Sequence, residues 1–399
     1  MEAVRGGITA PAGFTAAGVF CGIKRRGKDL ALIFSDRPAQ IAGMLTTNRL
    51  KASSVLRAER LLRKGIARAI VANSGNANCC TGRRGVRDTE TTADQLARAT
   101  GVPAAQVMVA STGVIGQPLP MNRLREGIRK SAGALSRTGS HAAAEALLTT
   151  DTRPKEIAFR FSVEGQPVTV AGIAKGSGMI APNMATMLAF LTTDAPVNRA
   201  GLRNALRFFV PRTFNAVTVD GEMSTNDMVL LMANGAAPVP ALRLGSRAYR
   251  NFFDAVGRVC RHLAHEIARD GEGVTRLFTV QVTGAARSEQ AEKIARQIAN
   301  SLLVKTMVAG RDPNWGRVAA AVGAAGVPFR PERLTLRLGK TVVLRNGAPT
   351  HPDREKLLEE VDRQEVAIGV ELGQGREEAQ MLSTDLTEDY VRINAKYTT

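Results

Sequence analysis

The chain reads Ala171-Gly-Ile-Ala-Lys175-Gly-Ser-Gly178-Met-Ile-Ala-Pro182-Asn183-Met-Ala185-Thr186-Met-Leu-Ala-Phe190 where two apolar, strand-like segments meet. The first segment ends at Lys175 and the second opens at Thr186, with small residues and then Pro182 between them. Apolar runs of this length, interrupted by Gly and Pro, predict two strands joined through a sharp bend. The stretch therefore predicts a sheet in which Thr186 begins a core strand.

Thr186 has the chemistry of a nucleophile if it becomes a chain terminus. A threonine hydroxyl is a weak nucleophile until a base removes its proton. A free α-amine, with a pKa near ~8, can be that base on the same residue. Such a terminus requires cleavage between Ala185 and Thr186: the hydroxyl attacks the preceding carbonyl, and water hydrolyses the resulting ester. Lys175 could then anchor an anionic substrate group beside the nucleophile.

The same residues also fit a purely structural interpretation, which their chemistry alone favours. A Gly-rich hairpin could simply connect two core strands, and Thr186 would then be a β-branched residue that packs well in a sheet. Spacing alone does not prove self-cleavage.

The composition is that of an ordinary globular protein. Of the 399 residues, 44% are apolar and 23% are charged, and this length predicts two or three domains at about 100–200 residues each. The start of the chain has no apolar signal segment, and no run reaches the ~18 apolar residues of a membrane span. We therefore expect a cytoplasmic protein that makes no membrane contact.

Neither the charge nor the cysteines favour a nucleic-acid or metal-binding protein. A formal charge of +18 could suit nucleic acid, but the arginines are scattered and aromatic residues are only 4% of the chain, which leaves few platforms for base stacking. Anionic small substrates account for the charge more simply. The spacing of Cys21, Cys79, Cys80 and Cys260 matches neither a zinc site nor a disulfide framework.

Periodicity predicts a mixed α/β (α+β) protein in which helices cover sheets. Strands are expected near Leu30–Phe34, Ala69–Val71, Val107–Ala110, Val168–Ile173, Met187–Leu191, Ala216–Val219, Met228–Met232 and Leu277–Val282. Helices are expected near Ser53–Arg63, Asp88–Ala99, Asn122–Ala132, His141–Leu148, Arg199–Phe208, Arg247–Ala268, Ser288–Leu303 and Arg354–Val361.

The stretch around Thr186 resembles the glutamate N-acetyltransferase (ornithine acetyltransferase) family of arginine biosynthesis. The resemblance runs from about Gly7 to Thr399. Its supporting blocks, in order, are Gly7-Ile-Thr-Ala-Pro-Ala-Gly-Phe14, Asn73-Ser-Gly-Asn-Ala-Asn78, Ser111-Thr-Gly-Val-Ile-Gly116, Thr149-Thr-Asp-Thr152, Ser224-Thr-Asn-Asp227, Arg269-Asp-Gly-Glu-Gly273 and Gly310-Arg-Asp-Pro-Asn-Trp-Gly-Arg317.

This resemblance implies a DmpA/ArgJ-like sandwich of sheets covered by helices, self-cleaved into an alpha chain, 1–185, and a beta chain, 186–399. The new terminal threonine would take an acetyl group from N-acetylornithine, release ornithine and pass the acetyl to glutamate. Some members also accept acetyl-CoA as donor. The resemblance implies no metal and no bound cofactor, no nucleic-acid or membrane partner, and a heterotetramer of two alpha and two beta chains.

The resemblance also assigns roles to individual residues. Thr186 would be the nucleophile, cleaved from Ala185, and Thr112 with Gly113 would form the oxyanion hole, whose donors stabilise tetrahedral intermediates. The substrate-binding residues would be Thr149, Lys175, Thr186, Glu266, Asn394 and Thr399.

Each of these roles has a plainer alternative. Thr112-Gly113 could be an ordinary turn, and Thr149 a helix cap, with the choice of threonine within 149–152 left open. His262, His265 and Glu266 have helical spacing that could present metal ligands, but the order His-Leu-Ala-His-Glu matches neither His-Glu-x-x-His nor His-x-x-Glu-His. Thr399 is the last residue, and chain ends usually fray.

Two other functions stay open at this stage. A related N-terminal-nucleophile amidase or aminopeptidase would use the same threonine with water as acceptor, and acceptor assays would separate the two. A non-catalytic basic binding protein would remain uncleaved and would bind nucleic acid in a salt-dependent manner.

Overall fold

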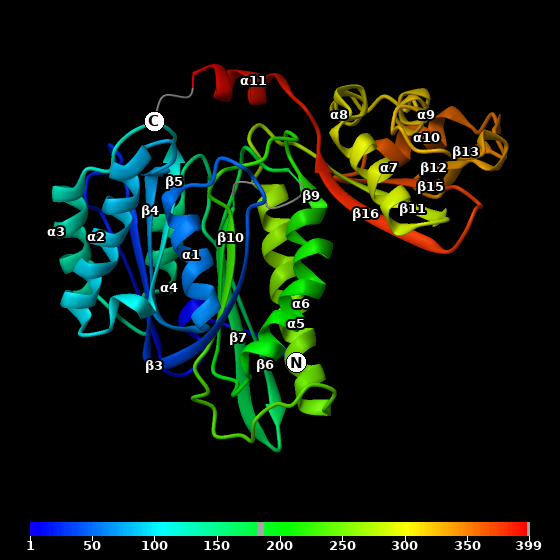
Figure 1. Cartoon of the computed structure of the whole chain (residues 1–399). Coiled ribbons are helices and arrows are strands. Elements are labelled where there is room, and N and C mark those ends of the chain that lie inside the picture. The colour runs from blue at the N-terminus through cyan, green and yellow to red at the C-terminus, as the bar shows by residue number, and fades with distance from the viewer. Residues whose placement is uncertain (182–186, 397–399) are drawn as a thin grey trace.

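The computed structural model describes residues 1–181 and 187–396. Figure 1 shows α2 and α3 on one side of a large body, α5 and α6 on the other, and strands with α1 and α4 between them. A second, smaller unit of helices and strands follows in the C-terminal part of the chain. The predicted mixed α/β class is confirmed.

The large body is built on a sheet of nine strands in the order β1-β6-β7-β8-β10-β3-β4-β5, with β2 paired to β3. Its strands are β1 (Glu2–Val4), β2 (Phe14–Val19), β3 (Leu30–Leu45), β4 (Ile66–Asn76), β5 (Val107–Val114), β6 (Lys155–Val163), β7 (Gln166–Lys175), β8 (Leu188–Thr193) and β10 (Met228–Ala233). Every residue of β8 is buried, because both faces of this central strand are covered.

Helices cover both faces of this sheet. They are α1 (Ser53–Lys64), α2 (Gly82–Thr100), α3 (Met121–Gly133), α4 (Ser140–Leu147), α5 (Arg199–Arg212) and α6 (Arg247–Arg269). Apolar side chains of α1 and α4 share one core with the sheet. On the opposite face, α5 and α6 pack on β6, β7, β8 and β10, and α2 and α3 pack on β3, β4 and β5.

The smaller unit has its own sheet and its own core. Its strand order is β14-β13-β12-β15-β11-β16-β9. The strands are β9 (Val217–Thr218), β11 (Leu277–Ala285), β12 (Thr335–Leu338), β13 (Thr341–Arg345), β14 (Ala348–Pro349), β15 (Glu365–Glu371) and β16 (Glu377–Thr384). The helices are α7 (Ser288–Asn300), α8 (Leu302–Ala309), α9 (Gly316–Gly323) and α10 (Arg354–Val361).

The last described element, α11 (Glu388–Ala395), leaves the smaller unit and lies across the top of the large body in Figure 1. It buries none of its residues. Short 3-10 turns occupy Gly7–Thr9, Ala104–Gln106, Phe214–Ala216 and Pro331–Arg333. No helix within 1–181 or 187–396 is long and apolar enough to cross a membrane.

Each predicted strand overlaps an observed strand, and most predicted helices are found within a few residues of their expected ends. The helix predicted over Ser288–Leu303 is two helices, α7 and α8. Ser301 between them has an extended backbone, and its hydroxyl accepts the Val304 N–H. A serine in this conformation caps the start of a new helix rather than continuing the old one.

Candidate active site

A cavity of about 410 Å³ lies where the ends of several strands and α11 meet. This volume is in the usual range for a small-molecule site. Five of the residues proposed from the sequence line it, although they are far apart in the chain: Thr112, Gly113, Thr149, Lys175 and Asn394.

Thr112 and Gly113 lie near the end of β5, where that strand pairs with Ser74 and Gly75 of β4. Gly113 has a φ of 131°, and a Cβ atom there would lie 2.3 Å from the carbonyl carbon of Gly75. Only glycine fits this backbone and this close approach. The two strands therefore hold the Thr112–Gly113 peptide rigidly in the cavity wall, as hydrogen-bond donors for an oxyanion must be held.

Thr149 and Thr150 follow the end of α4 and both line the cavity. The Thr149 N–H donates to Asp151 Oδ2 at 3.1 Å. Thr152 lies elsewhere: its N–H and hydroxyl both donate to the Asp270 carboxylate. Of the four residues in this segment, the structure thus brings Thr149 and Thr150 to the cavity.

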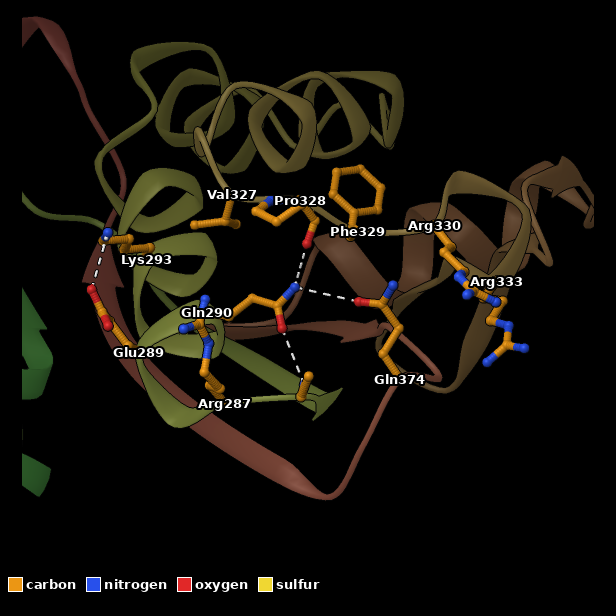
Figure 2. Close-up of a pocket in the computed structure, with 11 residues that line it drawn as sticks. Arg287, Glu289, Gln290, Lys293, Val327, Pro328, Phe329, Arg330, Arg333 and Gln374 are labelled. Carbon is orange, nitrogen blue, oxygen red and sulfur yellow. Dashed lines mark hydrogen bonds and ion pairs between the residues drawn. The ribbon is translucent and has the colours of Figure 1, made fainter.

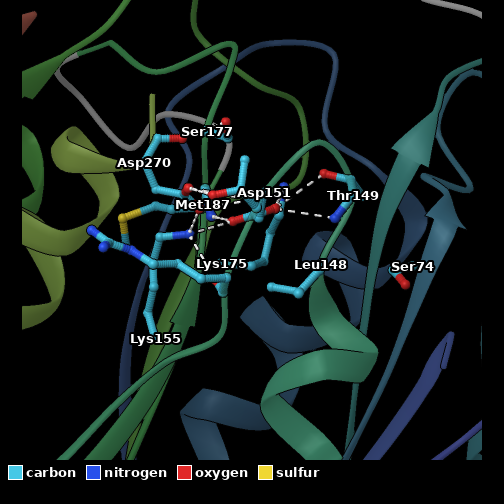
Figure 3. A network of polar contacts seen from close by, with 12 residues as sticks. Ser74, Leu148, Thr149, Asp151, Lys155, Lys175, Ser177, Met187 and Asp270 are labelled. Carbon is cyan, nitrogen blue, oxygen red and sulfur yellow. Dashed lines mark hydrogen bonds and ion pairs between the residues drawn. The ribbon is translucent and has the colours of Figure 1, made fainter. Parts of the chain in front are cut away.

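Lys175 ends β7, and its side chain is only 2% exposed. Burial lowers the pKa of this ammonium, and the nearby carboxylates of Asp151, Asp227 and Glu272 oppose that effect. Its Nζ lies 3.8 Å from Asp151 Oδ2, within the polar network drawn in Figure 3. The cavity therefore contains a cation that has been largely removed from water.

Ala185 and Thr186 lie outside the described residues, as does Thr399. The chain is described again from Met187, and Leu188 pairs with Lys175 in the antiparallel β7–β8 ladder. The Met187 N–H donates to Oδ1 of the fully buried Asp227 at 3.0 Å. The described strand β8 thus begins beside Lys175, two residues after Thr186 in the sequence.

Glu266 and the cavity are not brought together. Glu266 is on α6 and pairs with Arg153 at 3.0 Å and Arg269 at 3.9 Å. Glu272, six residues later, lines the cavity, and its Oε2 accepts the Asn394 Nδ2–H at 2.7 Å. The sequence carries Glu272 within the block Arg269-Asp-Gly-Glu-Gly273, so a signal for this residue was present, although the resemblance pointed to Glu266.

Three further residues line the cavity without a role predicted from the sequence: Ser224, Thr225 and Asn226. The Asn226 Nδ2 donates to the carbonyls of Ala77 and Ser111 at 2.7 and 2.8 Å. This amide therefore ties the loop before β10 to the strand that carries Thr112.

The metal interpretation of the α6 residues gains no support from their positions. His265 Nε2 lies 3.0 Å from Glu365 Oε1 in β15. Within 1–181 and 187–396, no three His, Cys, Asp or Glu side chains are grouped so that they could hold a metal ion.

A larger cavity, of about 740 Å³, lies in the smaller unit around Gln290 (Figure 2). The Gln290 side chain bridges three loops by bonding to the Ala286 N–H, the Pro328 carbonyl and Gln374. Arg287, Lys293, Arg330 and Arg333 surround it, all of them exposed. None of the residues proposed from the sequence lines this cavity.

Comparison with known proteins gives a consistent result. The model of the ArgJ family matches residues 15–399. The "arginine biosynthesis bifunctional protein ArgJ" of Symbiobacterium thermophilum is 50% identical over 402 aligned residues, covering all of both chains. The protein of the same name from Caldanaerobacter subterraneus subsp. tengcongensis is 45% identical, again over the full length of both.

Two solved structures are also similar. The bifunctional ArgJ protein of Bacillus halodurans is 42% identical, with a TM-score of 0.50, and the match covers 52% of this chain and 98% of that one. An ornithine acetyltransferase of Mycobacterium tuberculosis, solved with ornithine, is 42% identical, with a TM-score of 0.43, over 45% of this chain and 97% of that one.

Proposed function

Because this chain belongs to the ArgJ family, we propose that it is a self-processing acetyltransferase of arginine biosynthesis that moves an acetyl group from N-acetylornithine to glutamate. Full-length relatives carry an arginine-biosynthesis name. The observation that carries the proposal is the cavity that gathers Thr112, Gly113, Lys175, Glu272 and Asn394 beside the start of β8.

The proposed nucleophile is Thr186, freed by cleavage of the Ala185–Thr186 bond. Its α-amine accepts the hydroxyl proton while Oγ attacks the acetyl carbonyl of N-acetylornithine. The tetrahedral oxyanion is stabilised by the Thr112 hydroxyl and the Gly113 N–H. The C–N bond then breaks, the departing nitrogen takes the proton, and ornithine leaves an acetyl–Thr186 ester. The α-amine of glutamate attacks this ester, which yields N-acetylglutamate and restores the hydroxyl.

Substrate recognition is assigned to the charged residues of the cavity. The Lys175 ammonium suits a substrate carboxylate. Glu272 takes the role expected of Glu266, because it lines the cavity and can accept a hydrogen bond from a substrate ammonium group. Asn394 holds Glu272 in place. Thr149 or Thr150 completes this wall, and Thr399 stays a proposal from the resemblance alone.

The division into chains 1–185 and 186–399 belongs to the same proposal. The solved Bacillus halodurans chain matches almost completely, yet it spans only about half of this sequence. A relative divided near the position of Thr186 would have that length. The proposal that two copies of each chain assemble rests on the resemblance alone. Light scattering of the purified protein would measure the mass of this assembly.

Acetyl-CoA as a second donor is also proposed. The curated relatives are named bifunctional, which suits a protein that accepts acetyl groups from two donors. Glutamate acetylation by acetyl-CoA in the absence of N-acetylornithine tests this extension.

The decisive experiment is intact mass and N-terminal sequencing of the protein beside a Thr186→Ala variant, followed by acetyl exchange between N-acetylornithine and glutamate. We expect two co-purifying fragments, the second beginning Thr-Met-Leu-Ala-Phe, with exchange only in the cleaved protein. An uncleaved chain without exchange would reject the proposal. Cleavage with release of acetate, but no transfer to glutamate, would instead identify an amidase.

A further inference from the structure

A cluster of buried charges lies directly behind the cavity wall. Its members are Asp151, Lys155, Lys175 and Asp270, with side chains at most 3% exposed (Figure 3). Only Lys175 among them has a proposed substrate contact. Burying a charge costs a great deal of free energy unless it is paired, so three further buried charges at this point require an explanation.

Asp151 joins two segments that line the cavity. Its Oδ1 accepts the Gly176 N–H at 2.6 Å and pairs with Lys155 Nζ at 2.8 Å. Its Oδ2 accepts the Thr149 N–H at 3.1 Å and lies 3.8 Å from Lys175 Nζ. One carboxylate therefore sets the backbone of Thr149, the turn after β7 and the Lys175 ammonium relative to one another.

The charge state of Asp151 agrees with these contacts. Burial alone would raise the pKa of this carboxyl, but the ammonium groups of Lys175 and Lys155 and the Gly176 N–H hold it below its ordinary value. Asp151 is thus an anion at neutral pH, and it is the carboxylate paired with Lys175.

Lys155 and Asp270 connect the same polar network to the segment that follows α6. Lys155 Nζ lies 2.5 Å from Asp270 Oδ2, and the Asp270 carbonyl accepts the Ser177 hydroxyl at 2.6 Å. The Glu272 N–H donates to the Ser177 carbonyl at 3.1 Å. The position of Glu272 in the cavity is therefore tied, through Ser177 and Asp270, to Lys155 and Asp151.

We propose that Asp151 is a positioning residue that holds Lys175 charged and oriented toward the substrate carboxylate, with Lys155 and Asp270 as its buried support. This inference rests on the proposed function of Lys175. The four groups carry two positive and two negative charges, so the cluster is neutral as a whole. Replacing Asp151 by a neutral residue leaves two buried ammonium groups and one carboxylate. That carboxylate, Asp270, pairs with Lys155 at 2.5 Å, so Lys175 is the ammonium that loses its ion-pair partner.

The test is Asp151→Asn, assayed for acetyl transfer from N-acetylornithine to glutamate as a function of pH. Asparagine can still accept one N–H, but it carries no charge. We expect KM for the amino-acid substrates to rise, by up to about a hundredfold, with a smaller change in kcat. We also expect the alkaline limb of kcat/KM to move to lower pH, because a lysine that loses its paired carboxylate gives up its proton sooner.

The groups that act on Lys175 besides Asp151 are Lys155, Asp227 and Glu272, and Lys24 is close enough for its own pKa to respond to both Lys175 and Asp151. All of them are unchanged in the variant. The displacement of the alkaline limb is therefore attributable to the lost carboxylate.

Asp194→Asn is the matched control. Asp194 is also a buried carboxylate, and it accepts the N–H groups of Ala12 and Thr169 away from the cavity. This control should lower the melting temperature and leave the pH profile as in the wild type. A wild-type KM and alkaline limb in Asp151→Asn would overturn the inference, as would a lowered melting temperature as its only effect.

The double variant Asp151→Asn with Lys155→Gln covers the case in which Asp151→Asn alone does not fold. It restores neutrality, since Lys175 and Asp270 then balance. We expect recovery of folding while KM stays raised. Recovery of a wild-type KM would show that Asp151 serves folding only, and would reject the positioning role.

A second readout separates this inference from the proposed function. If the wild-type chain transfers no acetyl group, the proposed function fails, and the inference is judged by the titration of Lys175 alone. The pH dependence of Lys175 labelling by acetic anhydride, followed by peptide mass spectrometry, measures that titration. Its midpoint should lie lower in Asp151→Asn than in the wild type, and equal midpoints would overturn the inference.

Discussion

Gly113 illustrates how strongly one residue can be constrained by its neighbours. Its positive φ and the 2.3 Å approach to Gly75 leave no room for a side chain. Gly116, three residues on, also has a positive φ of 83°, but nothing lies within 4 Å of a Cβ placed there. A substitution at Gly116 therefore tests the effect of the left-handed backbone alone. A substitution at Gly113 adds a steric clash with β4.

We predict that Gly113→Ala lowers kcat/KM by about 10²–10³-fold, the usual effect of losing an oxyanion donor, because β5 must move away from β4. Gly116→Ala should cost about 1–2 kcal/mol of stability for its left-handed backbone and leave the kinetics close to wild type. Steady-state kinetics and thermal unfolding measure both effects. Equal kinetic losses in the two variants would contradict this assignment of Gly113.

Asp227 gives a prediction for pH. Burial raises the pKa of its carboxyl well above the ordinary 3.8, and the Met187 N–H, Ser224 and Lys175 offset this only in part. A carboxyl whose pKa is higher in the folded than in the unfolded protein contributes to stability while it is protonated. This contribution is complete at a pH below the unfolded-state pKa, and it is lost as the pH rises through the folded-state pKa. Asn at this position stays neutral at every pH.

The melting temperature of Asp227→Asn, relative to wild type, should therefore increase as the pH is raised from the ordinary aspartate pKa through the higher, folded-state pKa of Asp227. Asp151→Asn serves as a comparison, because the pKa of Asp151 is shifted in the opposite direction. Its carboxyl has a lowered pKa, so its contribution is present above the ordinary aspartate pKa and is lost only as the pH falls through the lower, folded value. A pH-independent difference for Asp227→Asn would contradict the raised pKa of Asp227.

At the scale of elements, α11 is unusual because it contributes to the cavity but to no core. None of its residues is buried, yet Asn394 reaches back from it to Glu272. Most helices in globular proteins are stabilised by packing of an apolar face. This helix is therefore a part of the site that can be removed without opening any of the hydrophobic cores.

We predict that a chain ending at Thr387 keeps its melting temperature within about 2 °C, a shift below ~1 kcal/mol for a protein of this size, while KM rises at least tenfold. A chain ending at Lys396 keeps Asn394 and lacks Thr399, so it isolates the contribution of the last three residues. Asn394→Ala should reproduce most of the effect of the longer truncation. Unchanged kinetics in the chain ending at Thr387 would remove α11 from the site.

At the scale of the whole molecule, the proposed cleavage would divide a single sheet. β8 and β10, from after Thr186, lie between β7 and β3, from before it. The cores on both faces of that sheet combine side chains from the two segments. Separation would expose apolar faces and long unpaired strand edges, which favour aggregation.

The two fragments should therefore co-elute on size-exclusion chromatography and separate only in denaturant. Segment 186–399 expressed alone should aggregate, and co-expression with 1–185 should recover soluble protein. Denaturing gels of the eluted fractions measure this outcome. Separation of the fragments under native conditions would contradict an interlocked sheet.

Local sequence determined much of this protein. α10 was predicted over Arg354–Val361 and has those bounds, because an apolar period and a capping Asp353 are local signals. The family resemblance pointed to Thr112, Gly113, Thr149, Lys175 and Asn394, all of which line one cavity. The chemical type of a residue and its spacing from near neighbours are properties of the sequence itself and do not depend on contacts with distant segments.

The tertiary structure alone decided what depends on contacts between distant segments. Glu266 and Glu272 are the same residue type six positions apart, and only the turn that ends α6 brings Glu272 to the cavity and leaves Glu266 beside Arg153. Several short strands of the smaller unit, such as β12 and β13, carry too few residues for a clear period. The buried pairing of Asp151 with two lysines likewise exists only because the chain folds three separate segments around it.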